Sequence, residues 1–352
     1  MGEMIEIVDE ADTIIFNWPF SIFNSSSVTA LQTILYHTTG FLDRYGMIEL
    51  ENYDQVITMK VKVLFLAALL AFSMLPGCSK NQYAQVVATT LPVYQFTSAL
   101  CQGTDITVAH LVTESVSCLH DYALSVSQVR AVESARVLVL SGAGLEDFME
   151  DLVEDAICTI DSSQGIDLVG CDNDHDEHDN AAHDHHHEVD SHIWLSPVNA
   201  KIMATNICQG LCQQFPEHSA IFQANLLKLH EQLNQLQAYG LSQLQDLSCR
   251  ELVTFHDGFT YFAQAFDLTI LEAIEEESGS EASAQELIHL IELVESHQLS
   301  AVFTECNGSV SAADIISRET GASSYALDMA MAGEDYFDAM YHNIHTIREA
   351  LG

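Results

Sequence analysis

The sequence predicts an α/β fold of two βα lobes, each a parallel sheet covered by helices, joined by a long rigid helix. Short apolar segments alternate with helical patterns from about residue 83 onward, and this alternation is typical of parallel sheets. One long helical pattern, from Pro216 to about Leu247, divides the alternation in two. Of the 352 residues, 48% are hydrophobic and only 18% are charged, which provides enough apolar material for a large core.

The first lobe is expected to alternate strands with helices. We expect its strands at 85–91, 105–112, 136–142 and 156–161. We expect its helices at 93–103, 125–135 and 145–155. Ser125 and Ser127 are both candidate N-caps of the second helix, because serine side chains accept hydrogen bonds from the first free backbone N–H groups.

The linking helix is indicated by apolar residues at alternating steps of four and three: Phe222, Leu226, Leu229, Leu233 and Leu236. Pro216 is expected in its first turn, where proline is well tolerated. Gly240 is the expected weak point, since glycine costs about 1 kcal/mol relative to alanine inside a helix.

The same alternation resumes in the second lobe. We expect strands at 251–257, 268–274, 300–306 and 323–330. We expect helices at 258–266, 283–298, 310–321 and 334–352. The predicted organisation is therefore a lobe at 79–215, a linking helix at 216–247 and a lobe at 248–352.

The charge balance excludes one class of partner. The chain has 51 acidic and 11 basic residues, a formal net charge of −40, whereas nucleic-acid binding needs a positive surface. An acidic chain suits a protein that handles cations or works outside the cytoplasm, although the charge could serve solubility alone. The nine cysteines contain no CxxC pair, so a zinc ribbon or finger is not expected.

Residues 59–78, "MKVKVLFLAALLAFSMLPGC", have the layout of a lipoprotein signal peptide. Lys60 and Lys62 precede an apolar run at 63–75, which is short for a membrane span of roughly 20 residues. The ending "LPGC" is similar to a bacterial lipobox, with Cys78 as the lipidated residue. We therefore expect an extracytoplasmic protein that a lipid at Cys78 anchors to the cell membrane.

The 58 residues before this segment conflict with a signal peptide, which works at an N-terminus. We hypothesise that Met59 is the true start and that residues 1–58 are a spurious or disordered extension. The alternative is a genuine cytoplasmic extension followed by a short anchor at 63–75.

A loop rich in histidine and acid is expected at 171–190, between the last strand of the first lobe and "HIWLSP". Its high polarity and lack of periodicity predict a solvated segment that binds metal weakly and raises the local Zn²⁺ concentration. Its histidines are His175, His178, His183, His185, His186 and His187.

Three other histidines and one aspartate lie near predicted strand ends. They are His120 in "CLHDYALS", His192 in "SHIWLSP", His256 in "TFHDGFTYF" and Asp328 in "YALDMA". Ligands of open α/β sheets bind beyond the carboxyl ends of the strands. Three imidazoles and a carboxylate suit a four-coordinate divalent cation, with Zn²⁺ the leading candidate. Each residue also has a simpler interpretation: a surface or hydrogen-bonded histidine, or an aspartate that caps a turn.

The segments "HDYALS", "HIWLSP", "TFHDGFTYFAQAF" and "VFTECNGS…ISRETG" resemble the metal-binding lipoproteins that serve zinc and manganese ABC importers. The resemblance covers about residues 79–352. It implies two βα lobes joined by a rigid helix, with a metal cleft between the lobes. It also implies His120, His192 and His256 as ligands, Asp328 as the carboxylate, and an ABC-transporter permease as partner.

Some positions depart from the family pattern. Leu119 stands where some zinc members carry an acidic residue, and "FTEC" replaces the common "FTEP". The fourth ligand is therefore Asp328, Glu305 or water. Manganese members tend to carry a carboxylate in place of His256, and three nitrogen ligands favour Zn²⁺ over Mn²⁺.

Several further residues are weaker candidates. Asp121 and Asp257 could orient the neighbouring histidines, and Cys118 could be a soft ligand. Glu275, Glu276 and Glu277 fit a solvated loop or a transporter-docking face. Cys208 and Cys212 share a predicted helix face and fit buried residues better than ligands.

We therefore expect a monomeric protein, not an enzyme, that captures Zn²⁺ and delivers it to an ABC importer. His192→Ala should remove most of the tight site, and deletion of 172–190 should leave it intact. Alternatives are a Mn²⁺ or Fe²⁺ transporter of the same fold, a zinc hydrolase, although no HExxH motif is present, and a metal buffer or adhesin that depends on the histidine-rich loop.

Overall fold

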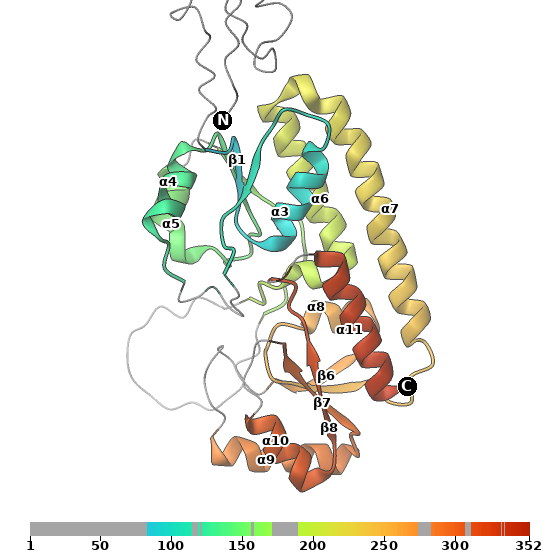
Figure 1. The fold of residues 1–352 in the computed structure, drawn as a ribbon. Helices are drawn as coiled ribbons and strands as arrows, with labels where there is room; N and C mark the ends of the chain where they lie inside the picture. The colour runs from blue at the N-terminus through green and yellow to red at the C-terminus, as the bar shows by residue number, and fades with distance from the viewer. Residues whose placement is uncertain are drawn as a thin grey trace, which may run out of the picture. The chain divides into compact units, whose positions relative to one another are not determined.

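The computed structural model describes residues 83–114, 119, 122–155, 158–170, 189–273, 283–306, 311–331, 333 and 335–352. Lys80–Gly352 form one compact unit (Figure 1). The predicted extension at 1–58 and signal segment at 59–78, with Cys78, lie outside the described residues. Within the described ranges, no helix is both long and apolar enough to cross a membrane.

The first lobe contains a parallel sheet in the order β2-β1-β3-β4. Its strands are β1 (Val86–Ala88), β2 (Val108–His110), β3 (Val137–Leu140) and β4 (Thr159–Asp161). Its helices are α3 (Leu91–Cys101), α4 (Val126–Ser134) and α5 (Glu150–Asp155), the last preceded by a 3-10 turn at Asp147–Met149. Ser125 is the N-cap of α4: its hydroxyl accepts from the N–H of Gln128, whose side chain accepts from the Ser125 N–H in return.

The second lobe repeats the arrangement as β6-β5-β7-β8, again all parallel. Its strands are β5 (Glu251–Thr254), β6 (Thr269–Ala273), β7 (Ala301–Glu305) and β8 (Ser323–Leu327). Its helices are α8 (Thr260–Ala265), α9 (Ala284–His297), α10 (Ser311–Thr320) and α11 (Tyr336–Leu351). The predicted pair of βα lobes is therefore confirmed.

The helix α6 (Pro197–Gln214) packs on the first lobe, and α7 (Ser219–Leu244) connects the two lobes. They lie side by side in Figure 1, and α7 also contacts α3 and α11. Pro216 is in a separate 3-10 turn, Pro216–His218, so the long helix begins later than the sequence predicted. It also ends before Leu247, because the Arg250 guanidinium binds the carbonyl oxygens of Leu244 and Gln245 at 2.8 and 3.1 Å.

Gly240 is required by packing, and is not simply a weak point of the helix. A Cβ atom at this position would lie 2.2 Å from Cε1 of Phe266. The absent side chain therefore lets α7 approach the Phe266 ring closely. The helix-propensity cost of glycine is offset by this contact between the linking helix and the second lobe.

The larger apolar core draws on both lobes. Leu138 on β3 and Phe303 on β7 both belong to it, and both are almost fully buried. Val302, the neighbour of Phe303, belongs instead to a smaller cluster on the other face of the second sheet, which α9 and α10 cover. The second sheet is thus buried on both faces, as parallel sheets usually are. The two lobes thus share one contiguous apolar core.

Candidate metal centre

Two histidines from different lobes meet in the interior. His192 directly precedes the 3-10 turn Ile193–Leu195, and His256 follows β5. Their Nε2 atoms are 3.3 Å apart and each residue is 4% exposed. The rings meet edge to face, with centroids 5.0 Å apart. The structure thus brings two of the predicted ligands together.

The strand order explains the position of His256. The chain passes from β5 to β6 on one side, whereas β7 and β8 lie on the other side of β5. The central strands β5 and β7 therefore form the point at which the strand order reverses, and ligands bind at the carboxyl ends of strands there. His256 follows β5, and Glu305 is the last residue of β7.

Local packing fixes the position of His192. Ile193, Trp194 and Leu195 are all fully buried, so the apolar turn after His192 belongs to the core. The Trp194 indole N–H donates to the carbonyl oxygen of Met329 at 2.8 Å. This bond joins the turn to the second lobe, and α6 then starts at Pro197 with Ser196 as N-cap.

Each imidazole has a buried carboxylate beside its Nδ1 atom. Nδ1 of His192 is 2.9 Å from Oδ1 of Asp190, which also accepts the His192 backbone N–H at 2.8 Å. Nδ1 of His256 is 3.3 Å from Oε1 of Glu305. The carboxylate acceptor at His192 places the proton of that ring on Nδ1, an assignment that follows from the hydrogen-bond geometry. Nε2 of His192 then faces Nε2 of His256 with a lone pair.

This geometry fits a divalent cation. Zn²⁺ binds histidine nitrogen at about 2.0–2.1 Å in tetrahedral sites, so two such nitrogens stand about 3.3–3.4 Å apart. The observed 3.3 Å agrees with this separation. Carboxylates behind the ligating histidines are the usual outer partners of zinc sites, because they fix the tautomer and the ring orientation.

Asp190 and Gly258 lie against the two histidines, and the sequence analysis did not single them out. Asp190 was counted within the solvated loop 171–190, but it is 3% exposed and holds His192, so the loop prediction is wrong at this end. Val189 pairs with Gly170 in an antiparallel bridge. The sequence feature that could have identified Asp190 is its position two residues before His192. The six loop histidines and Cys171 lie outside the described residues.

Gly258 lies against both histidines. A Cβ atom there would be 2.8 Å from Nδ1 of His192, 2.8 Å from Cδ2 of His256 and 2.5 Å from Cε of Met329. Only glycine therefore leaves room for the two rings in their present positions. The sequence feature that could have identified Gly258 is its position two residues after His256, at the end of a predicted strand.

The structure describes only part of the predicted ligand set. His120, Asp121 and Cys118 lie outside the described residues. Of their neighbours, Leu119 is fully buried, and its carbonyl oxygen accepts the Tyr122 N–H at 3.0 Å. Within the described part of the chain, no three His, Cys, Asp or Glu side chains converge as a metal site.

Asp328 follows β8, as expected, and stabilises the next turn. Its Oδ1 accepts the Ala330 N–H at 2.8 Å, and Asn343 Oδ1 accepts its backbone N–H at 2.7 Å. This is the turn-capping interpretation of the residue. Its role as a ligand stays a prediction, as does that of Glu305, whose place beside Nδ1 favours an orienting role.

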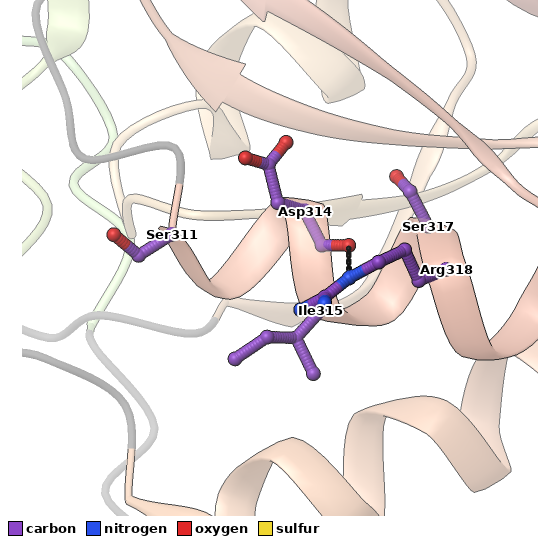
Figure 2. A pocket seen from close by; sticks show the side chains of 5 residues that line it. All are labelled: Ser311, Asp314, Ile315, Ser317 and Arg318. Carbon is purple, nitrogen blue, oxygen red and sulfur yellow. Dashed lines mark hydrogen bonds between the residues drawn. The ribbon is translucent and has the colours of Figure 1, made fainter.

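Two remaining features lie outside this site. Burial raises the pKa of the Cys208 thiol to about 12, which agrees with a buried residue rather than a ligand. A cavity of about 730 Å³ lies along α10, lined by Ser311, Asp314, Ile315, Ser317 and Arg318 (Figure 2). It includes none of the predicted ligands. Arg318 Nε donates to the carbonyl oxygen of Asp314 at 3.2 Å within the same helix.

The repeated 2-1-3-4 strand order and the histidine pair between the sheets define a two-lobe α/β protein of the solute-binding class. The family model described as "Zinc-uptake complex component A periplasmic" (ZnuA) matches residues 86–350. The chain belongs to this family, which confirms the resemblance to zinc-type metal-binding proteins.

Individual relatives agree with this assignment. The zinc-binding lipoprotein AdcA of Streptococcus pneumoniae is 28% identical over 311 residues, covering 83% of this chain and 61% of AdcA. The zinc-binding protein AdcA of Streptococcus pyogenes is 27% identical over 318 residues, covering 82% and 61%. This chain thus spans 61% of the length of these relatives. The crystal structure of ZnuA is 29% identical, with a TM-score of 0.66, and the match covers 76% of this chain and all of that one.

Proposed function

We propose that this protein is the extracytoplasmic binding component of a zinc importer, which captures Zn²⁺ and delivers it to an ABC-transporter permease. The observation that carries the proposal is the 3.3 Å separation of Nε2 atoms between His192 and His256. Each imidazole has a buried carboxylate beside Nδ1. Membership of the zinc-uptake family supports the same cargo.

The donor atoms favour zinc among the divalent cations. Imidazole suits Zn²⁺, whereas Mn²⁺ prefers carboxylate and carbonyl oxygen. We propose His120 as the third nitrogen ligand, and Asp328, Glu305 or water in the fourth position. Mn²⁺ is the weaker candidate. A binding component of a transporter needs no nucleophile or general base, so we propose no enzymatic activity.

The fold suggests how the cargo is held. We propose a first lobe at 79–215, a linking helix at 216–247 and a second lobe at 248–352, with the ion bound between the lobes. The shared core and the 26-residue helix α7 oppose a wide hinge motion. Release to the permease would then need only a small separation of His192 from His256, because the two ligands belong to different lobes.

A metal titration tests the proposal. The purified protein should bind one Zn²⁺ tightly, as measured by competition with a chromophoric chelator, and excess Mn²⁺ should not displace it. Preferential binding of Mn²⁺ or Fe²⁺ would favour a transporter for those ions. Turnover of a test ester or peptide by the zinc-loaded protein would favour a hydrolase. Several weak sites without a tight one would favour a metal buffer or adhesin.

We also propose that the mature protein is a monomer anchored by a lipid on Cys78, with Met59 as the true start. The family description includes the word "periplasmic", and AdcA of Streptococcus pneumoniae is named a zinc-binding lipoprotein. Both names support an extracytoplasmic location. Intact mass spectrometry of the native protein tests this. The expected species begins at Cys78 and carries a diacylglyceryl group. A mature species that retains residues 1–58 would contradict it.

A further inference from the structure

We propose that Tyr261 is a positioning residue of the metal centre, whose hydroxyl holds the His192 segment in register with the His256 segment. This inference rests on the proposed function, because it concerns the same pair of ligands. Tyr261 belongs to α8, in the segment that follows His256. Its side chain is buried, with the residue 2% exposed.

The Tyr261 hydroxyl bridges two backbone segments of the first lobe. It donates to the carbonyl oxygen of Asp190 at 3.0 Å and accepts the Val169 N–H at 3.0 Å. The same two segments also bind each other, since the Asp190 N–H donates to the carbonyl oxygen of Val169 at 2.9 Å. One hydroxyl from the second lobe thus fixes both strands at the base of the histidine-rich loop.

Asp190 connects this hydroxyl to the metal ligand. Its carbonyl oxygen binds Tyr261, while its carboxylate Oδ1 binds both the backbone N–H and Nδ1 of His192. His256 and Tyr261 belong to the same backbone segment, and Tyr261 is linked through Asp190 to His192. The Nε2 atoms of His192 and His256, 3.3 Å apart, complete this ring of contacts.

Loss of the hydroxyl should loosen this arrangement without emptying the core. Phenylalanine would fill the same space, but the buried Asp190 carbonyl and the Val169 N–H would lose a partner. The Asp190 segment could then shift relative to α8, and His192 would shift with it. Outer partners of metal ligands are worth about 10–100-fold in affinity. Tyr261 acts through Asp190, so we expect a loss of about tenfold.

The test compares Tyr261→Phe with Tyr336→Phe. Tyr336 is also fully buried and its hydroxyl also donates to a first-lobe carbonyl oxygen, that of Trp194 at 2.7 Å, but it does not bind Asp190. Zn²⁺ affinity is measured by chelator competition, and the visible spectrum of the Co²⁺-loaded protein reports ligand geometry. Tyr261→Phe should bind Zn²⁺ about tenfold more weakly and change the Co²⁺ spectrum. Tyr336→Phe should mainly change stability and weaken Zn²⁺ binding less than Tyr261→Phe does, because its hydroxyl reaches Trp194 and not Asp190.

A double mutant isolates the route through Asp190. In an Asp190→Ala background, Tyr261→Phe should cause a smaller loss of affinity than in the wild type, because the carboxylate that links Asp190 to His192 is absent. The inference would be overturned if the affinity losses of Asp190→Ala and Tyr261→Phe simply multiplied in the double mutant. It would also be overturned if Tyr336→Phe lost as much affinity as Tyr261→Phe, or if Tyr261→Phe kept the wild-type affinity and Co²⁺ spectrum. If the wild-type protein bound no Zn²⁺, the proposed function itself would fail, and the two failures are thus distinguishable.

Discussion

The Nε2 atoms of His192 and His256 lie 3.3 Å apart, although the residues are 64 positions apart in the sequence and come from different lobes. Neither side chain has freedom to turn away, since both are buried and each has a carboxylate at Nδ1. Both nitrogens are within reach of a single Zn²⁺ ion. If the ion binds there, it should stabilise the fold by mass action.

The first prediction concerns these two ligands. His192→Ala and His256→Ala should each weaken Zn²⁺ binding on the order of 100-fold or more, because outer partners alone are worth 10–100-fold. Each variant should also lose most of the rise in Tm that Zn²⁺ gives the wild-type protein. Chelator competition and thermal melting measure the two effects.

His230→Ala is the control for this pair. His230 lies on α7, where its Nε2 contacts the carbonyl oxygen of Lys201 at 3.1 Å, away from the predicted ligands. It should keep both the affinity and the thermal shift. Equal losses in all three variants would show that the histidines act through general stability.

The second prediction concerns the space around the rings. Gly258→Ala places a Cβ atom 2.8 Å from each histidine ring, so the imidazoles must separate. We expect at least about a tenfold loss of Zn²⁺ affinity, comparable to loss of an outer partner, and a stability cost of about 1–3 kcal/mol from overpacking. Isothermal titration and urea unfolding measure these.

Gly240→Ala is the matched control for Gly258→Ala. Its Cβ atom would meet the Phe266 ring at 2.2 Å, so the overpacking is similar but involves no predicted ligand. It should cost a similar free energy of unfolding with unchanged Zn²⁺ affinity. Unchanged affinity in Gly258→Ala would contradict the tight fit around the histidines.

The fold was largely predictable because parallel strands and their covering helices have strong local patterns. Strand ends were less so. Residues 85–91 predicted one long strand, but β1 ends at Ala88, because Thr90 is already the N-cap of α3, which begins at Leu91. Likewise, the end of α7 depends on Arg250, which is distant from the helical pattern itself.

The site was predictable only where the sequence marks single ligands. His256 follows β5, as the strand-end pattern predicted, whereas His192 precedes a 3-10 turn and is marked only by the motif "HIWLSP". Asp190 was not marked, since its composition is that of the loop, and only its tertiary contacts with His192 and Tyr261 distinguish it from the other acids. Burial of a polar side chain is a property of the folded chain, and local composition does not reveal it.

The third prediction separates the loop from its base. Gly170 and Val189 pair in an antiparallel bridge, so residues 171–188 can be replaced by Asn-Gly, a dipeptide that favours two-residue hairpin turns. This variant should keep one tight Zn²⁺ site of unchanged affinity and lose additional weak binding. Equilibrium dialysis with Zn²⁺ measures both classes of site.

Deletion of 172–190 is the informative contrast, because it also removes Asp190. The original expectation that this deletion leaves the site intact must change, since Asp190 holds His192 at 2.9 Å. Its affinity should fall about 10–100-fold. Loss of the tight site in the Asn-Gly variant as well would instead place the ligands within the loop.

The last prediction concerns Glu146, a buried carboxyl between β1 and β3. It accepts hydrogen bonds from the Thr89 hydroxyl and from the N–H groups of Ser141 and Gly142. Burial nevertheless raises its pKa to about 7. Because the folded-state pKa lies above the unfolded value, its contribution to stability is present at low pH and is lost as the pH rises to about 7.

Glu146→Gln removes this titration. The free energy of unfolding of the wild-type protein minus that of the variant should therefore fall by about 1–3 kcal/mol between about pH 5 and about pH 8. Urea unfolding of the zinc-free proteins across this range measures the difference. Glu154→Gln, at an exposed position on α5, is the control and should follow the wild-type pH dependence. If the Glu146→Gln curve also runs parallel to the wild type, the carboxyl is already ionised in the folded protein at low pH, and its hydrogen bonds outweigh the burial.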